Sequence, residues 1–142
     1  MKVSEWLEKH PQHPITVRPE SRIREVADYY LSHPAERDLY IVTSEGRILG
    51  HIRHRRLALA LLKEHLPVQS SHQIMERLSC NTAKDLMEHE FVTAHPEEEL
   101  DNVIHRMMEY LVEDMPVIDD EELIIGKINL TEILLAIQQD EI

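Results

Sequence analysis

Two stretches of the chain space their apolar residues with the period of an α-helix. The first stripe comprises Ile23, Val26, Tyr30 and Leu31. The second comprises Leu100, Val103, Ile104, Met107, Met108 and Leu111. Acidic residues 97–99 precede the second stripe, where the positive end of a helix dipole favours them. The spacing predicts one amphipathic helix in each half of the chain.

Each predicted helix is followed by two short apolar segments with a turn between them. Residues 39–42 and 48–52 flank Thr43-Ser44-Glu45-Gly46, and residues 115–118 and 123–128 flank residues 119–122. Apolar, β-branched runs on either side of polar turn residues are typical of a hairpin. We therefore expect one antiparallel strand pair in each half.

The helices expected after these hairpins are apolar at consecutive positions, from Leu57 to Leu62 and from Ile133 to Ile137. Such helices must be covered on several sides, because a single buried stripe cannot hide all of their apolar residues. In a short chain a second copy is a suitable cover, so we expect a homodimer. The connector of residues 65–81 is expected to hold a short helix from Gln73 to Leu78.

The two halves are copies of one unit. Ile15-Thr16-Val17-Arg18-Pro19-Glu20 aligns with Val92-Thr93-Ala94-His95-Pro96-Glu97 at an offset of 77 residues. From Asp38 and Asp114 onward the offset is 76, which aligns Gly50 with Gly126. We predict an α+β fold of two β-α-β-β-α repeats, with the first repeat at 1–64, the connector at 65–81 and the second repeat at 82–142.

Composition narrows the classes of protein that fit. The chain has 142 residues, and none of its apolar runs approaches the roughly 20 residues that span a bilayer. Its N-terminus has no apolar signal core, so we expect a cytoplasmic protein and no membrane partner. A single cysteine and three glycines argue against internal disulfides, Cys-rich metal sites and Gly-rich phosphate loops.

The net charge of −12 opposes nucleic-acid binding, which depends on cations that neutralise phosphates. The charge is uneven, however. Residues 1–63 carry 11 Lys and Arg against 8 Asp and Glu, whereas residues 64–142 carry 4 against 19. The basic excess is densest from Arg47 to Arg56, which forms a local anion-attracting cluster.

The repeat resembles a tandem pair of CBS domains, the regulatory module named after cystathionine beta-synthase. The second copy carries the resemblance most clearly, at Ala83-Lys84-Asp85-Leu86-Met87, Met115-Pro116-Val117-Ile118-Asp119 and Gly126-Lys127-Ile128. The first copy is similar at Arg37-Asp38-Leu39-Tyr40-Ile41-Val42 and Gly46-Arg47-Ile48-Leu49-Gly50. The resemblance covers nearly the whole chain, and it implies that the two β-α-β-β-α repeats are pseudo-twofold-related and pack as one CBS pair.

This resemblance implies clefts between the copies that hold adenosine compounds such as AMP, ADP, ATP or S-adenosylmethionine. In the family, a Gly-x-x-Ser/Thr-x-x-Asp motif holds the ribose. Here Asn129 and Glu132 stand at the hydroxyl and Asp positions after Gly126, and Arg53 and Arg56 stand there after Gly50. The ligand-binding residues implied are Thr16, Tyr40, Arg53, Arg56, Thr93, Met115, Pro116, Val117, Asn129 and Glu132.

Several of these residues have a second interpretation. Glu132 can accept hydrogen bonds from ribose hydroxyls, but Asn129-x-x-Glu132 also fits a helix capping box. Arg53 and Arg56 have only donors, and they suit either a phosphate or a carboxylate from the acidic half of the chain. If they bind phosphate, Arg53→Ala with Arg56→Ala should abolish any preference among nucleotide phosphates. Tyr40 fits base stacking or core packing.

No metal or catalytic site is expected. The pairs His10/His13 and His51/His54 have metal-ligand spacing without an evident third ligand, and Cys80 has no assignable partner base. We predict a non-enzymatic, stand-alone regulatory pair that binds an adenosine-type nucleotide and signals to an effector protein. The alternative is a non-catalytic interaction or assembly protein with a degenerate nucleotide site. Neither a redox cofactor nor a metal is predicted.

Overall fold

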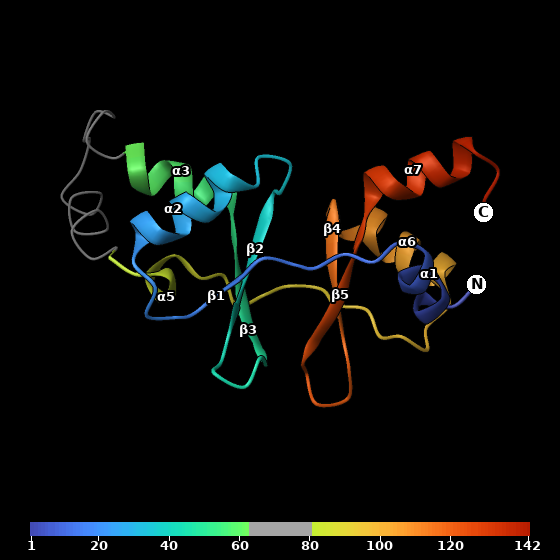
Figure 1. Cartoon of the computed structure of the whole chain (residues 1–142), viewed down its shortest axis with the longest axis horizontal. Helices are drawn as coiled ribbons and strands as arrows, with labels where there is room; N and C mark the ends of the chain where they lie inside the picture. Colours follow the sequence, from blue (N-terminus) through green and yellow to red (C-terminus); the bar gives the residue numbers. More distant parts are fainter. Residues whose placement is uncertain (63–80) are drawn as a thin grey trace. The chain divides into compact units, whose positions relative to one another are not determined.

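The computed structural model of the chain describes residues 1–62 and 81–142, which form two compact units (Figure 1). We call Ile15–Phe91 the central unit, and Met1–Pro14 together with Val92–Ile142 the terminal unit. The predicted helix from Gln73 to Leu78, Cys80 and all of the predicted connector except Asn81 lie outside the described residues.

The central unit holds a three-stranded sheet and its helices. Its elements are β1 (Thr16–Val17), α2 (Ile23–Ser32), β2 (Asp38–Val42), β3 (Ile48–Arg53), α3 (His54–Leu61) and α5 (Ala83–Leu86). The strands lie in the order β1-β2-β3, with β1 parallel to β2 and β2 antiparallel to β3. The predicted hairpin is therefore confirmed, and Gly46 in its turn has a φ of 91°.

The terminal unit repeats this plan with one strand fewer. Its elements are α1 (Val3–Lys9), α6 (Leu100–Tyr110), β4 (Asp114–Ile118), β5 (Ile124–Asn129) and α7 (Leu130–Gln138). The strands β4 and β5 pair antiparallel, as predicted. The expected first strand is reduced to one parallel bridge between Ala94 and Val117.

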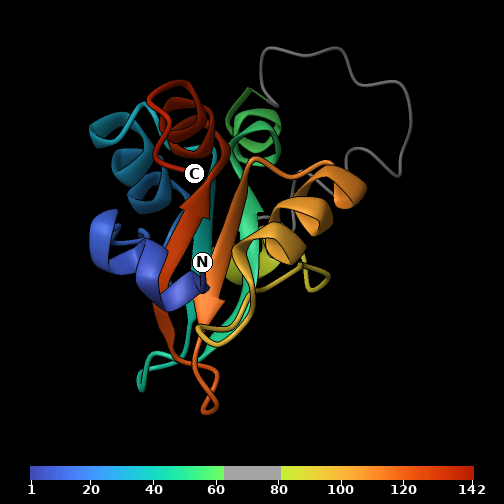
Figure 2. The ribbon, with the colours of Figure 1, turned by 90° about the vertical axis from the view of Figure 1, so that its right-hand side faces the viewer.

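Each unit contains one helix that the sequence assigned to the other repeat. In the terminal unit, α1 buries Val3 and Trp6 in the core, and Leu7 packs against that core beside β5 (Figure 2). In the central unit, α5 buries Ala83 and Leu86. The predicted repeats, 1–64 and 82–142, are continuous in sequence. In the compact units, α1 of the first repeat belongs to the terminal unit and α5 of the second repeat belongs to the central unit.

The amphipathic helices bury a narrower stripe than their apolar residues suggested. α2 buries Ile23, Val26 and Tyr30, and α6 buries Leu100, Val103 and Met107. In contrast, Leu31, Met108 and Leu111 are 79%, 48% and 90% exposed. Leu31 and Met108 each come one position after a buried residue, so the 3.6-residue period turns them away from the core. Leu111 lies beyond the last turn of α6 as its left-handed C-cap, with a φ of 56°, so it no longer follows the helical stripe.

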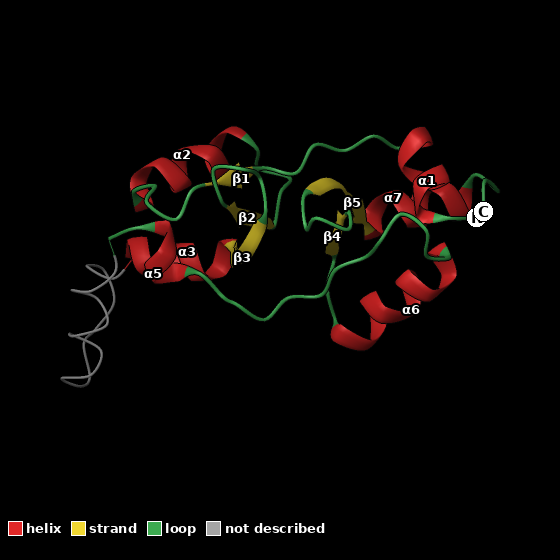
Figure 3. Cartoon of the chain, turned by 90° about the horizontal axis from the view of Figure 1, so that it is seen from below, coloured by secondary structure: helices red, strands yellow, loops and turns green. Residues whose placement is uncertain are grey.

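The helices that end the repeats also bury one face only. α3 follows β3 directly, and α7 follows β5 directly (Figure 3). α3 buries Leu57, and α7 buries Ile133 and Ala136. Six other large apolar residues, in these two helices or directly after α3, are exposed: Leu59, Leu61, Leu62, Leu134, Leu135 and Ile137. We expected these helices to be covered on several sides, and within the described residues they are covered on one side only.

Across the described ranges 1–62 and 81–142, none of the helices combines the length and hydropathy needed to cross a bilayer.

Candidate functional site

The start of α7 is the segment at which the family resemblance places the ribose-binding motif. Asn129 ends β5, and its Oδ1 accepts a hydrogen bond from the Glu132 backbone amide at 3.2 Å. Its Nδ2 donates to Oδ1 of Asp114 at 2.7 Å. Asn129 is thus the N-cap of α7, which was one of its two sequence-based interpretations.

The side chain of Glu132 does not turn back toward the Asn129 amide as a capping box requires. Its Oε1 instead accepts a hydrogen bond from Nε2 of Gln12, in the segment after α1. Oε2 of Glu132 is buried and has no hydrogen-bond partner among the residues that the structure describes. The motif therefore presents one carboxylate oxygen that is bonded and one that is desolvated and open to a donor.

In the central unit, Arg53 binds the segment that follows α5, and Arg56 binds the last residue of α5. The guanidinium of Arg53 lies across the carboxylate of Glu88, with Nη2 at 2.8 Å from Oε2 and 3.1 Å from Oε1. Nε of Arg56 donates to the carbonyl of Leu86 at 2.8 Å. Glu88 belongs to the acidic half of the chain, so this geometry is the carboxylate pairing that the sequence allowed for Arg53.

His51 lies beneath this ion pair and is only 9% exposed. Its Nδ1 is 2.9 Å from Oδ2 of Asp38, and its Nε2 is 3.2 Å from the carbonyl of Glu90. Burial lowers the pKa of His51, but the hydrogen bond and charge of Asp38, the charge of Glu88 and the Glu90 carbonyl together raise it above its ordinary value.

The other predicted ligand-binding residues are distributed between core and surface. Tyr40 and Val117 are buried, as are Met115 and Pro116, whereas Thr16 is exposed. Thr93 is half-buried, and its carbonyl accepts a hydrogen bond from Arg106 at 2.7 Å. Tyr40 therefore occupies the core position that was one of its two interpretations.

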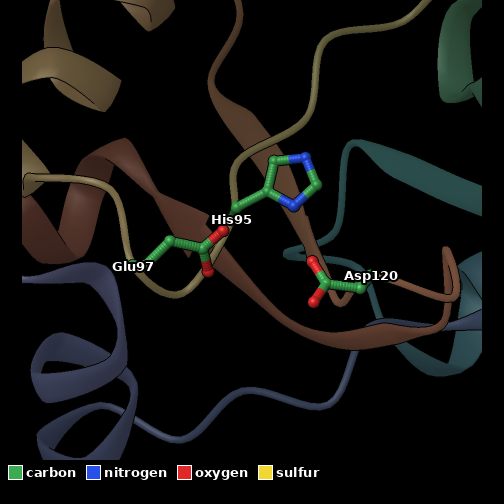
Figure 4. Close-up of side chains that lie close together, drawn as sticks. All are labelled: His95, Glu97 and Asp120. Atoms are coloured by element: carbon green, nitrogen blue, oxygen red, sulfur yellow. The ribbon is translucent and has the colours of Figure 1, made fainter.

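A second cluster of polar side chains was not expected from the sequence. His95, Glu97 and Asp120 each offer a ligand atom, and these atoms all lie within 4.8 Å of one another. Figure 4 shows a ring nitrogen of His95 directed toward the Asp120 carboxylate. The repeat contains a signal for this cluster. Residues 92–97 and 115–120 align with the segments of the first repeat that hold β1 and β2, and these two strands pair.

Comparison with known proteins supports the same architecture. The family model for the CBS domain matches residues 7–63 and again residues 83–139. A CBS domain-containing protein from Thermotoga maritima is 25% identical with a TM-score of 0.76, and the match covers 98% of this chain and 95% of that chain. The CBS domain pair of protein MJ0100, solved with 5′-methylthioadenosine and S-adenosyl-L-methionine, is 25% identical with a TM-score of 0.74, over 96% of this chain and 99% of that chain.

A curated relative is much longer than this chain. It is the L-aspartate semialdehyde sulfurtransferase of Methanocaldococcus jannaschii, 27% identical over 120 residues, which are 84% of this chain and 20% of that protein. The chain thus spans about a fifth of the relative's length. Two family matches, a repeated β-α-β-β-α plan and full-length likeness to solved CBS pairs lead to one conclusion: this chain belongs to the CBS-domain family and forms a tandem pair of CBS repeats.

Proposed function

We propose that this CBS pair is a regulatory module that binds an adenosine-type nucleotide, with Glu132 as the acceptor for the ribose hydroxyls. The observation that carries the proposal is the buried Oε2 of Glu132, which has no hydrogen-bond partner among the described residues. A buried carboxylate oxygen without a donor is costly, and a ribose hydroxyl would supply the donor.

Before a ligand binds, Gln12 fixes the orientation of the Glu132 carboxylate. Its amide donates to Oε1 of Glu132, so it holds the carboxylate in one orientation. A ribose has two neighbouring hydroxyls, and a bidentate interaction would require Gln12 to give up this bond or share the oxygen. Binding therefore exchanges one donor for another, which couples ligand occupancy to the segment after α1.

The ligand class follows from the family and from one relative. The CBS domain pair of protein MJ0100 was solved with 5′-methylthioadenosine and S-adenosyl-L-methionine. We propose AMP, ADP, ATP or S-adenosylmethionine as the candidates for this chain. A ligand changes the output of such a module only if it binds two of its conformations unequally, so the proposed signal is a shift between conformations that an effector protein recognises.

The test is thermal unfolding against AMP, ADP, ATP, S-adenosylmethionine, NAD and inorganic phosphate. A ligand that binds only the folded chain raises its Tm. We expect a rise with one adenosine compound, none with phosphate, and loss of the rise in Glu132→Gln. Glu109→Gln removes the same charge from an exposed position of α6 and should keep the full rise. A flat panel at millimolar ligand, or an unchanged rise in Glu132→Gln, would contradict the proposal.

A second candidate function is a non-catalytic interaction or assembly protein. The observation that favours it is the Arg53–Glu88 pair, because Glu88 occupies the guanidinium that a phosphate would need. In this alternative, the equivalent site of the central unit is closed by an internal carboxylate. If Arg53→Ala with Arg56→Ala leaves the ranking of nucleotides unchanged in the same panel, phosphate recognition by this cluster is excluded.

We further propose that the chain is a homodimer. Leu134 and Leu135 in α7 are 60% and 52% exposed, and Leu59 in α3 is 53% exposed. Apolar side chains gathered on the outer faces of two helices are typical of an interface. Light scattering should give twice the chain mass, and Leu134→Lys with Leu135→Lys should give a monomer. Ile125→Lys, at a 48% exposed apolar position on β5, is the matched control and should remain a dimer.

We propose that the module itself is not catalytic and that it acts in the cytoplasm. The sulfurtransferase relative shares only 20% of its length with this chain, so its activity does not follow from the match. A sulfur-transfer assay with the purified chain would overturn this part of the proposal if it showed turnover.

A further inference from the structure

The cluster of His95, Glu97 and Asp120 lies within the terminal unit and takes no part in the proposed nucleotide site. Two facts set it apart from an ordinary surface group of acids. The first is its chemistry, an imidazole and two carboxylates whose ligand atoms lie within 4.8 Å of one another. The second is that Nδ1 of His95 is buried without a hydrogen-bond partner among the described residues.

The loop that carries His95 and Glu97 is fixed on both sides. Arg106 in α6 donates to the Thr93 carbonyl at 2.7 Å and to the Glu98 carboxylate, whose Oε2 in turn accepts from the His95 backbone amide at 2.8 Å. The hydrogen bond from Arg106 is the main reason that the pKa of Glu98 lies below its usual range. Glu98 is therefore committed to Arg106, whereas Glu97 beside it is exposed and available.

The turn that carries Asp120 is fixed in the same way. Oδ1 of Asp119 accepts from the amides of Glu121 at 2.9 Å and Leu123 at 3.0 Å, which closes the turn between β4 and β5. The bridge between Ala94 and Val117 holds the two strands side by side just before both groups of ligands. Asp119 thus serves the backbone, and Asp120 is left to face His95 (Figure 4).

We propose that His95, Glu97 and Asp120 bind a divalent first-row transition metal, with Zn²⁺ as the probe. Ligand atoms around tetrahedral zinc lie about 3.4 Å apart, since each is roughly 2.0–2.1 Å from the metal. The exposed side chains of Glu97 and Asp120 can rotate to close the remaining difference. An imidazole ligand favours zinc, copper, nickel or iron over Mg²⁺ and Ca²⁺, and two carboxylates balance the charge of a divalent ion.

Isothermal titration of the full chain with Zn²⁺ tests the proposal. We expect one saturable site in the wild-type chain and a loss of roughly tenfold or more in affinity in Glu97→Gln and Asp120→Asn, because even changes outside the ligand shell cost that much. Both side chains are exposed, so these variants should keep the wild-type Tm in the absence of metal. His95→Gln should lose affinity as well, and Mg²⁺ should bind far more weakly than Zn²⁺.

Two controls separate this site from general attraction of cations to an acidic chain. Glu121→Gln removes one charge from the same turn, and His105→Gln removes an exposed imidazole from α6 of the same unit. Both should bind Zn²⁺ like the wild type. The proposal is overturned if Zn²⁺ does not bind, if Asp120→Asn binds as tightly as Glu121→Gln, or if Mg²⁺ binds as well as Zn²⁺.

Discussion

His51 and Asp38 face each other across the β2–β3 hairpin, and Lys127 and Asp114 do the same across the β4–β5 hairpin. Nδ1 of His51 lies 2.9 Å from Oδ2 of Asp38, and Nζ of Lys127 lies 3.6 Å from Oδ1 of Asp114. Both cations are buried or nearly so. The two repeats therefore place a basic side chain opposite a carboxylate at equivalent positions, a histidine in the central unit and a lysine in the terminal unit.

This difference predicts that the stability of the central unit depends on pH. The raised pKa of His51 means that its protonated form contributes stability fully below about pH 6.5 and loses it as the pH rises through the folded-state pKa. The groups that face the ring are Asp38, Glu88 with its partner Arg53, and the Glu90 carbonyl. Urea unfolding of wild type and His51→Gln at about pH 6 and pH 8.5 should show a gap that narrows at the higher pH.

The control for this experiment is His89→Gln, which removes an exposed imidazole from the same unit. The difference in unfolding free energy between wild type and His89→Gln should be the same at both pH values. A gap between wild type and His51→Gln that stays constant with pH would mean that folding does not raise the pKa of His51, and it would contradict the prediction.

The Lys127–Asp114 pair leads to a prediction about the stability of the terminal unit. Both side chains are almost fully buried, with exposed fractions of 3% and 4%, and Asp114 also accepts from Asn129. Asp114→Ala removes the carboxylate that faces both donors and should cost about 3 kcal/mol of unfolding free energy. Asp119→Ala in the exposed turn is the comparison and should cost less, and equal losses measured by urea unfolding would contradict the role of burial.

Much of the fold was predictable from the sequence because it depends on local patterns. The hairpins and the helix at Leu100 follow from apolar periods and turn residues, and the capping of α7 by Asn129 follows from residue type. The exposure of Leu31 and Met108 was not predictable in this way, because the period alone does not say how wide a face the neighbouring strands cover.

The site was less predictable because its groups are brought together by contacts between distant segments. Gln12 meets Glu132 across 120 residues, and Arg53 meets Glu88 across 35. Both contacts depend on the exchange of α1 and α5 between the units, which no local pattern encodes. His95 and Asp120 lie close only because Ala94 pairs with Val117. Sequence spacing therefore shows which residues have suitable chemistry, but not which of them meet.

The exchange of α1 predicts that a residue at the start of the chain stabilises the unit built from its end. Trp6 is fully buried in the core of the terminal unit. Trp6→Ala should lower the unfolding free energy by about 3–5 kcal/mol, as for other large buried aromatic residues. Trp6→Phe keeps an aromatic ring and should cost less, because Nε1 has no hydrogen-bond partner among the described residues to lose. Urea unfolding followed by circular dichroism measures both, and a neutral Trp6→Ala would refute the placement of α1.

Gly50 and Gly126, at equivalent positions of the two repeats, test the same exchange. Gly50 faces the segment after α5, and Gly126 faces Leu7 of α1. A Cβ at Gly50 would lie 2.5 Å from Cγ of Met87 and 2.6 Å from the carbonyl oxygen of Glu88. The Glu88 backbone cannot easily retreat, because it exchanges two hydrogen bonds with His51, at 3.0 and 2.8 Å. We therefore expect Gly50→Ala to cost about 1–3 kcal/mol, the usual range for overpacking.

Gly126→Ala is the matched substitution in the terminal unit, and it should be tolerated better. Its Cβ would lie 2.9 and 3.1 Å from the two methyl groups of Leu7, which are the ends of a flexible side chain and not backbone. A rotamer change of Leu7 relieves that contact, whereas no rotamer moves a carbonyl. Urea unfolding of the two variants should thus rank Gly50→Ala below Gly126→Ala in stability. The reverse order would mean that the segment after α5 yields more readily than the side chain of α1, and that its hydrogen bonds to β3 do not hold it in place.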